Sequence, residues 1–266
     1  MAKTAFAVAA HPDDIEMVMA GTLLLLADRG FEIHYLNVAN GSMGTQTHSR
    51  EEIIEIRRAE ARSAARSIGA VYHESLVDDL DIFYRSETTR QLCAIMREVA
   101  PDILLVQSPC DYMEDHQNAV RLAVTAAFCR GMRNMNSIPS RPPIEKEVTV
   151  YHAQPHGNRD PLRQLVRAGI YVDISGVVAQ KREMLACHES QKSWLDVSQG
   201  MDSYLTTMED LSRETGELSG RYRYAEGWRR RNHLGFCGPD ADPLSEALGD
   251  VSHIDEKYER ALDRPE

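Results

Sequence analysis

In the first forty residues, short continuous runs of apolar residues are separated by a segment whose apolar residues have helical spacing. Thr4–Ala10 is almost wholly apolar, which is typical of a strand buried on both faces of a parallel sheet. After a turn that contains Pro12, the pattern from about residue 15 to residue 29 predicts a helix, and Gly30 is well placed to end it. The alternation over residues 31–39 then predicts a second strand.

The same succession of strand and helix continues through most of the chain. Further strands are predicted over residues 71–76, 102–107, 148–153 and 170–174, and helices over 51–68, 87–99, 118–133 and 177–189. This order is typical of an α/β fold, with a Rossmann-like, mostly parallel sheet flanked by helices. Because crossovers between parallel strands are right-handed, the loops that follow the strands are expected at one sheet edge, where such folds bind ligands.

The pattern changes after about Ser193, where the chain becomes more polar and irregular. We therefore expect an α/β domain over residues 1–192, which would carry any catalytic site, and a C-terminal helical extension over residues 193–266. The extension is expected to pack on the α/β domain, as part of it or as a small appendage, and to fray from Asp240 onward.

Composition and net charge limit the kinds of partner that the protein is expected to bind. The 266 residues carry a formal net charge of −11, which disfavours nucleic acid and anionic membranes, because both need a basic face. The longest apolar run, Leu23–Ala27, is far shorter than a membrane span, so no membrane anchor is expected. Five widely spaced cysteines without a C-x-x-C pair, and an N-terminus without a signal-like apolar segment, favour a cytoplasmic protein.

The turn after the first predicted strand reads His11-Pro12-Asp13-Asp14. Zinc and similar divalent metals bind imidazole nitrogens and carboxylate oxygens. If Pro12 opens a helical turn, His11 and Asp14 can converge on one ion while Asp13 projects differently. The alternative is that an aspartate in this turn only caps the next helix.

The loop after the strand at 102–107 carries a second polar cluster, which ends in Asp115-His116. This loop is expected at the same sheet edge as the first turn, so His116 can complete a His-Asp-His set. Three protein ligands leave one coordination position for water, as in catalytic zinc sites. The alternative is that Asp115 and His116 only cap the following helix.

These two motifs resemble those of the PIG-L/LmbE family of zinc-dependent de-N-acetylases. Family members begin with a strand that ends in Ala-His-Pro-Asp-Asp, here residues 10–14, and carry a second motif that ends in Asp-His. The resemblance covers most of the chain and includes Arg57-Arg58-Ala59-Glu60-Ala61, Val172-Asp173-Ile174-Ser175 and Tyr224-Ala225-Glu226-Gly227. It implies an amidohydrolase that removes an N-acetyl or other N-acyl group from an amino-sugar conjugate, such as a derivative of N-acetylglucosamine.

The resemblance also implies roles for individual residues. One Zn²⁺ per chain would be bound by His11, Asp14 and His116, and metal-bound water would be the nucleophile. Asp13 would be the general base, because a carboxylate that binds the metal cannot also accept the water's proton efficiently. Arg57 looks like the family's arginine that reaches the substrate from the helix after the Gly-rich loop. The alternative for this arginine is an ion pair on the helix surface with Glu60 or Glu51.

One position departs from the family pattern. The second motif usually begins with a histidine that stabilises the oxyanion or protonates the leaving group, but Met113 stands there. Methionine can do neither, and the loss of one such donor commonly lowers the rate by ~10²–10³. Our first candidate for a replacement is His156, which follows a predicted strand in a Gly/Pro turn, although it also fits an ordinary surface histidine. Tyr112 and Glu114 are alternatives.

Two other functions stay open at this stage. Met113 is compatible with a catalytically impaired, metal-bearing protein that binds a sugar ligand. The same chemistry could also act on a non-sugar N-acyl amine. The expected partner is in any case a small molecule, and a homo-oligomer is compatible with the resemblance, since relatives often assemble.

Overall fold

The structure is a computed structural model that describes residues 2–192 and 203–263. Its strands are β1 (Thr4–Ala9), β2 (Glu32–Asn37), β3 (Val71–His73), β4 (Ile103–Val106), β5 (Thr149–Ala153), β6 (Ile170–Asp173), β7 (Ala225–Arg230) and β8 (Ser252–Ile254). Its helices are α1 (Asp14–Val18), α2 (Ala20–Asp28), α3 (Arg50–Ser67), α4 (Ser86–Val99), α5 (Glu114–Phe128), α6 (Val178–Ala186), α8 (Ser203–Ser219), α9 (Pro243–Leu248) and α10 (Glu256–Asp263), with a short 3-10 turn at His156–Asn158.

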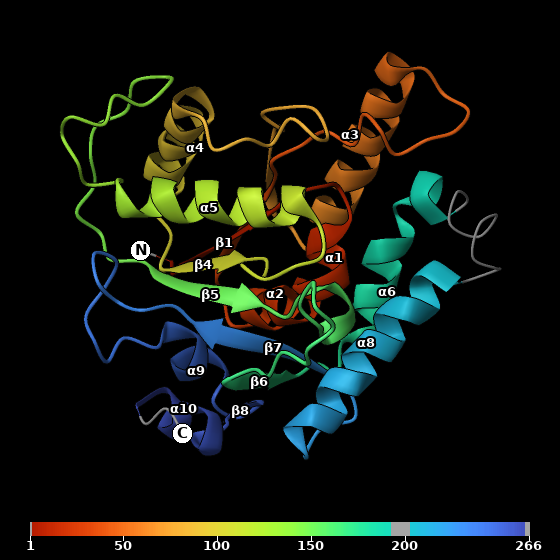
Figure 1. The fold of residues 1–266 in the computed structure, drawn as a ribbon, viewed down its shortest axis with the longest axis vertical. Coiled ribbons are helices and arrows are strands. Elements are labelled where there is room, and N and C mark those ends of the chain that lie inside the picture. The colour runs from red at the N-terminus through yellow and green to blue at the C-terminus, as the bar shows by residue number, and fades with distance from the viewer. Residues whose placement is uncertain (1, 193–202, 264–266) are drawn as a thin grey trace.

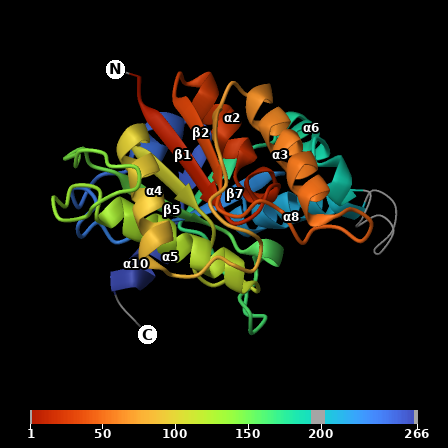
Figure 2. The same ribbon diagram turned by 90° about the horizontal axis from the view of Figure 1, so that it is seen from above.

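The strands form one eight-stranded sheet in the order β3-β2-β1-β4-β5-β7-β6-β8. The first five strands in this order are parallel, whereas β7 is antiparallel to both of its neighbours and β8 is antiparallel to β6. Helices cover the sheet on both sides (Figure 1), and the turned view shows α4 and α5 in one layer and α2 and α6 in the other (Figure 2). The predicted α/β fold with a mostly parallel sheet is confirmed.

The apolar run at residues 4–10 is buried on both faces, as predicted. Ala5, Ala7 and Ala9 belong to the hydrophobic core on the α2 side of the sheet. Phe6 and Val8 point the other way, into the core beneath α4 and α5. Because successive side chains of a strand alternate between faces, one apolar run contributes to both cores, and this fixes β1 in the interior of the sheet.

Two helices differ from the sequence prediction in ways that matter for function. The helix predicted over residues 15–29 is divided at Met19 into α1 and α2. The helix predicted over residues 118–133 begins earlier, at Glu114. His116 therefore lies in the first turn of α5 and not in the loop before it.

The C-terminal segment contributes strands as well as helices. A helical extension was expected over residues 193–266, and α8, α9 and α10 are indeed helices, but β7 lies between β5 and β6 inside the sheet. The fraying expected after Asp240 is also wrong, because α9, β8 and α10 form there. Residues 193–202 lie outside the described residues, and the domain boundary at 192/193 stays a prediction.

A buried ion pair links this C-terminal strand to the helices behind the sheet. Lys181 Nζ lies 2.7 Å from Glu226 Oε1, and the two side chains are 1% and 3% exposed. The Glu226 carboxylate also accepts hydrogen bonds from the backbone N–H groups of Gly21 and Thr22 at the start of α2. Residues 224–227 thus contribute Glu226 from β7, whereas residues 172–175 lie in β6 and in the turn before α6, the helix that carries Lys181.

Replacing Lys181 by methionine is expected to destabilise the protein by about 3 kcal/mol, because it leaves a buried carboxylate without its cation. Chemical denaturation should show this loss as a lower unfolding midpoint. The matched control is Arg260→Met, which breaks the exposed Arg260–Glu256 pair on α10 and should leave the midpoint unchanged. Equal midpoints for both variants would contradict a structural role for the buried pair.

Candidate metal centre and active site

The site lies where two neighbouring parallel strands end. β1 is paired with β2 on one side and with β4 on the other, so the chain leaves the sheet in opposite directions at this point. Open α/β sheets bind their ligands at such a switch point. His11 follows β1 directly, and the backbone N–H of Ala10 donates to Gln107 Oε1 at 2.8 Å, which ties the two loops together.

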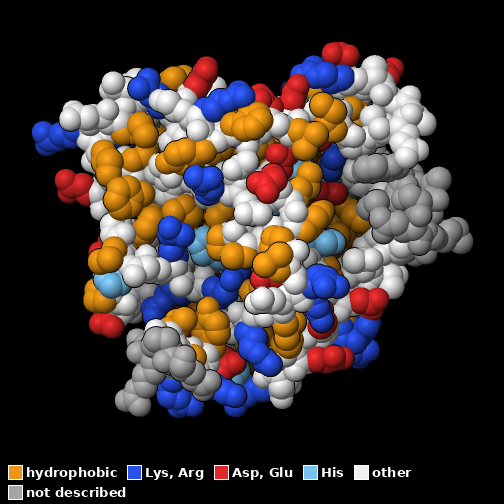
Figure 3. Space-filling view, viewed as in Figure 1, with side chains coloured by type: hydrophobic (Ala, Val, Ile, Leu, Met, Phe, Trp, Pro, Cys, Tyr) orange, Lys and Arg blue, Asp and Glu red, His pale blue; other side chains and the backbone are white. Residues whose placement is uncertain are grey.

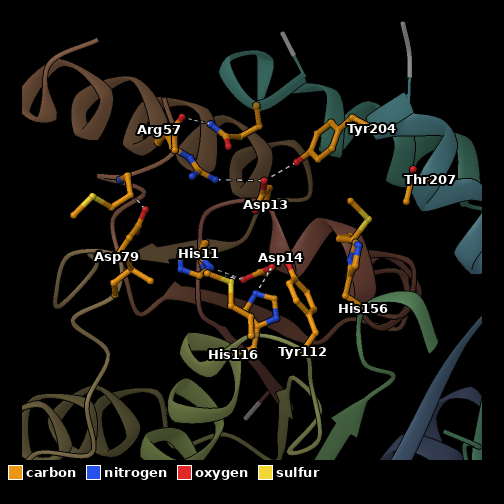
Figure 4. A pocket seen from close by; sticks show the side chains of 16 residues that line it. His11, Asp13, Asp14, Arg57, Asp79, Tyr112, His116, His156, Tyr204 and Thr207 are labelled. Carbon is orange, nitrogen blue, oxygen red and sulfur yellow. Dashed lines mark hydrogen bonds and ion pairs between the residues drawn. The ribbon is translucent and has the colours of Figure 1, made fainter. Parts of the chain in front are cut away.

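The donor atoms of His11, Asp14 and His116 lie within 4.8 Å of one another. His11 Nδ1 is 3.4 Å from Asp14 Oδ2, and His116 Nε2 is 3.4 Å from Asp14 Oδ1. Figure 4 shows both rings and the carboxylate turned toward one point. Two imidazole nitrogens and one carboxylate oxygen match the donors that zinc prefers, so these residues fit the metal that the sequence predicted.

Each histidine is held by a second carboxylate on its far nitrogen. His11 Nε2 lies 3.0 Å from Asp115 Oδ2, and His116 Nδ1 lies 2.8 Å from Asp111 Oδ1. Such carboxylate partners orient the ring of a metal-binding histidine and fix which nitrogen faces the metal. The arrangement leaves His11 Nδ1 and His116 Nε2 directed at the common point, which supports the fit of a divalent metal.

Acidic and basic side chains are concentrated at this point. Burial opposes protonation of His11, but the carboxylates of Asp115 and Asp14 outweigh it and raise the pKa of His11 to about 10. Burial alone would raise the pKa of Asp14, yet His116 and His11 hold it well below its usual range. The carboxylates of this site thus favour positive charge between them, which suits a divalent cation.

Asp13 points away from the metal donors, as the sequence predicted. It has a left-handed backbone with φ 106°, which turns its side chain away from that of Asp14. Its Oδ2 atom accepts a hydrogen bond from the Tyr204 hydroxyl at 2.8 Å and lies 3.3 Å from Arg57 Nη2 (Figure 4). Burial raises the pKa of the Asp13 carboxyl, and Arg57 offsets only part of this rise.

Arg57 reaches the site from α3 beneath the Gly-rich loop. Its guanidinium also donates to the carbonyl oxygen of Pro12, and the residue is 3% exposed. A Cβ atom at Gly41 or Gly44 would lie 2.4 Å from the Arg57 side chain, and Gly41 has φ 81°. Glycine at these two positions therefore leaves the space that the arginine occupies.

The alternative ion pairs considered for Arg57 do not form in the described part of the chain. Glu60 binds the backbone N–H and hydroxyl of Ser190, and Glu51 pairs with Arg50. Arg57 is buried and paired with the base candidate Asp13, so it is not a surface residue of the helix.

The capping alternatives for the two motifs are also not observed. Asp13 occupies the N-cap position of α1 but makes no side-chain capping hydrogen bond. Met113 is the N-cap of α5, and it makes none either. The Asp115 carboxylate binds His11 and the backbone N–H of Leu80.

A cavity of about 430 Å³ opens over these residues. His156 and Met113 both line it, together with Tyr112. The Tyr112 ring lies 5.6 Å from the ring of His116 and 5.7 Å from that of His156, so it contacts both (Figure 4). The structure thus brings His156 to the same cavity as the metal donors, and its assignment as the acid stays a prediction.

Sequence reasoning did not assign four residues that shape the site. Asp111 and Asp115 orient the histidines, and their presence in the loop beside His116 was a usable signal. Asp79 accepts from the backbone N–H groups of Gly41 and Met43 and so anchors the Gly-rich loop. Neither Asp79 nor Tyr204 stands in a motif that could have identified it.

Comparison with known proteins gives consistent results. Residues 6–128 match the sequence profile of the PIG-L family, described as GlcNAc-PI de-N-acetylase. The chain is 29% identical over 233 residues to a diacetylchitobiose deacetylase of Thermococcus kodakarensis, covering 85% of this chain and 82% of the relative. It is 27% identical over 201 residues to a 4-oxalmesaconate hydratase of Pseudomonas putida, covering 71% and 74%.

The fold agrees with the sequence comparison. The crystal structure of N,N'-diacetylchitobiose deacetylase from Pyrococcus horikoshii superposes with a TM-score of 0.73 at 25% identity, covering 88% of this chain and 85% of that one. Because 88% of the chain is covered, the structural similarity extends beyond residues 6–128.

Proposed function

We propose that the chain, whose residues 6–128 match the PIG-L profile, is a zinc-dependent amidohydrolase that removes the N-acetyl group of an amino-sugar conjugate. The observation that carries this proposal is the convergence of His11, Asp14 and His116 beside Asp13 in one cavity. A metal donor set next to a separate, partly buried carboxylate is the combination that amide hydrolysis by water needs.

Zinc bound by His11, Asp14 and His116 would polarise both water and the amide carbonyl. Asp13 then accepts the proton of the attacking water. Its Oδ2 is engaged by Tyr204 and Arg57, so Oδ1, which has no hydrogen-bond partner among the described residues, is the atom that receives the proton. Because burial raises the pKa of this carboxyl, Asp13 is a stronger base than an exposed aspartate and can return the proton to the leaving amine.

His156 is our candidate for the group that replaces the family's histidine, whose role is to stabilise the oxyanion or to protonate the leaving group. It lines the cavity on the far side of the Tyr112 ring from His116, and its backbone N–H donates to Asp111 Oδ2 at 3.1 Å. Met113 occupies the position of the family histidine but has no proton to give. The connection through Asp111 couples the loop of His156 to the carboxylate that orients His116.

The similarity to a hydratase suggests a second candidate reaction, the hydration of a carboxylate substrate. The residues that line the cavity favour the hydrolysis of an amide instead. Apart from the metal, a carboxylate substrate would be held by an unpaired lysine or arginine, and Arg57 is the only such residue among the described residues that line the cavity. Its guanidinium is already paired with Asp13 and bonded to Pro12. An uncharged acetamide has no such requirement.

The proposal leads to a direct assay. Purified protein with about one zinc per chain is expected to release acetate from N-acetylglucosamine glycosides or N,N'-diacetylchitobiose, and chelation of the metal should stop the release. Acetate is measured by a coupled enzymatic assay and zinc by elemental analysis. Zinc in the site with no release across the panel would favour the sugar-binding alternative, and release only from non-sugar N-acyl amines would change the substrate class.

The expectations about partners and location remain proposals. Within residues 2–192 and 203–263, no helix is both long and apolar enough to cross a membrane. We propose a small-molecule substrate, a cytoplasmic location and self-association as the setting in which this activity operates.

A further inference from the structure

The mouth of the catalytic cavity carries three exposed apolar side chains, which we call the apolar rim: Met43, Leu80 and Tyr112. Each lines the cavity, and they are 58%, 61% and 61% exposed. Met17 and Met113 also line the cavity. The outside of the molecule also shows scattered hydrophobic side chains among charged ones (Figure 3). Single exposed apolar side chains are ordinary, but the rim gathers three around one opening.

The backbone fixes the rim relative to the metal donors. The N–H of Met43 donates to Asp79 Oδ2 at 2.9 Å, and the N–H of Leu80 donates to Asp115 Oδ2 at 2.7 Å. Asp115 is the same carboxylate that orients His11. The third rim residue, Tyr112, packs its ring against the ring of His116. The backbone that carries the rim is therefore held in place without a ligand, which lowers the cost of binding an apolar group there.

Leu80 adds an independent sign of function. Its φ of 63° places a branched side chain in the left-handed region, which asparagine or glycine adopts far more readily. Strain of this kind is concentrated at ligand-binding positions, where surrounding contacts hold it. Here the hydrogen bond to Asp115 holds the backbone, and the side chain extends over the cavity mouth.

The inner part of the cavity has the opposite character. Its charged and polar groups include the metal donors, Asp13 and the paired Arg57, and these side chains are buried or partly buried. The polar interior thus suits the amide and its sugar, while the rim would contact whatever extends outward from them. A sugar alone would leave the rim in water.

We propose that the substrate is an uncharged N-acyl amino sugar that carries an apolar alkyl or aryl group, and that this group packs on the rim. This inference rests on the proposed function and specifies its substrate class. The apolar group can belong to the aglycone or to the acyl chain, and the experiment distinguishes these two sources.

Three substrates separate the outcomes: methyl and hexyl β-glycosides of N-acetylglucosamine, and the methyl glycoside of N-hexanoylglucosamine. Each methylene that leaves water contributes ~4-fold. One of the two hexyl compounds is therefore expected to exceed the methyl acetyl compound in kcat/KM by at least ~10-fold. Equal kcat/KM for all three would overturn the proposal while leaving the proposed hydrolase function intact.

The variant Leu80→Asn tests the rim without adding strain, because asparagine tolerates a positive φ and keeps the N–H that binds Asp115. The ratio of kcat/KM for the preferred hexyl compound to that for the methyl compound should fall at least ~3-fold. The matched control is Leu162→Asn at a leucine that is 76% exposed and does not line the cavity. A ratio that is the same in both variants would contradict the role of Leu80.

Binding supplies a readout that does not depend on hydrolysis. Hexanohydroxamate is expected to bind the zinc-loaded protein at least ~10-fold more tightly than acetohydroxamate if the acyl chain lies on the rim. Hexyl glucoside should bind more tightly than methyl glucoside if the aglycone does. If no substrate is hydrolysed, the proposed function is contradicted, while these two binding comparisons still show whether the rim binds an apolar group. Affinities that do not depend on alkyl chain length in either comparison would overturn the proposal about the rim.

Discussion

Asp13→Asn is expected to lower acetate release by ~10²–10⁴, the usual contribution of a positioned general base. The amide of asparagine keeps the shape of the carboxylate and its contact with the Tyr204 hydroxyl, but it cannot accept a proton from water. Zinc content should stay near that of the wild type, because Asp13 is not among the converging donors. Steady-state kinetics and elemental analysis on the same preparation measure both quantities.

A second substitution, which weakens the contacts of Asp13 without removing its carboxylate, makes this test more specific. Tyr204→Phe removes one hydrogen bond to Asp13 Oδ2, so a loss of kcat smaller than that in Asp13→Asn is expected, with little change in KM. Tyr35→Phe is the control, because its buried hydroxyl has no hydrogen-bond partner among the described residues. Hydrolysis by Asp13→Asn at the wild-type rate would show that the base is another group.

His116→Ala is expected to remove both the metal and the activity. Two donors, His11 and Asp14, would remain, too few for a stable zinc site. Asp111→Asn should have a milder effect, because it only weakens the orientation of the His116 ring. Loss of such a partner typically costs 10–100-fold in metal affinity. Equilibrium dialysis against buffered zinc measures the zinc affinity of the wild type and of both variants.

The control for the metal series is His233→Ala, a histidine outside the cavity lining. It should bind zinc as the wild type does. Circular dichroism is needed to show that His116→Ala remains folded, since the substitution also removes a buried partner of Asp111. A folded His116→Ala protein with wild-type zinc affinity would contradict the assigned ligands.

The fold and the metal donors were predictable because both are encoded locally. An apolar run such as Thr4–Ala10 can only be an interior strand, and polar residues directly after two such strands must emerge at one sheet edge. That rule brings His11, Asp14 and His116 together, and the family resemblance assigns them as metal ligands, which stays a prediction. His156 reached the cavity for the same reason, because it follows the parallel strand β5.

The residues that escaped prediction depend on contacts between distant segments. Tyr204 and Asp13 are 191 positions apart, and no local pattern relates a tyrosine on α8 to a turn after β1. β7 was missed because its sequence is polar for a buried strand. Glu226 can be buried because Lys181 pairs with it. A glycine is required at position 227 because a Cβ atom there would lie 2.8 Å from neighbouring side chains.

The position of β7 has a consequence for the order in which the chain can fold. During synthesis the N-terminal segments emerge first, so β1, β2, β3, β4 and β5 can pair as a parallel unit before the rest exists. β6 cannot, because its two neighbours, β7 and β8, both come later in the chain. Until residues 225–230 are made, its apolar edge is unpaired. The nascent protein thus passes through an aggregation-prone stage, which ends when β7 inserts and α8 brings Tyr204 to the catalytic base.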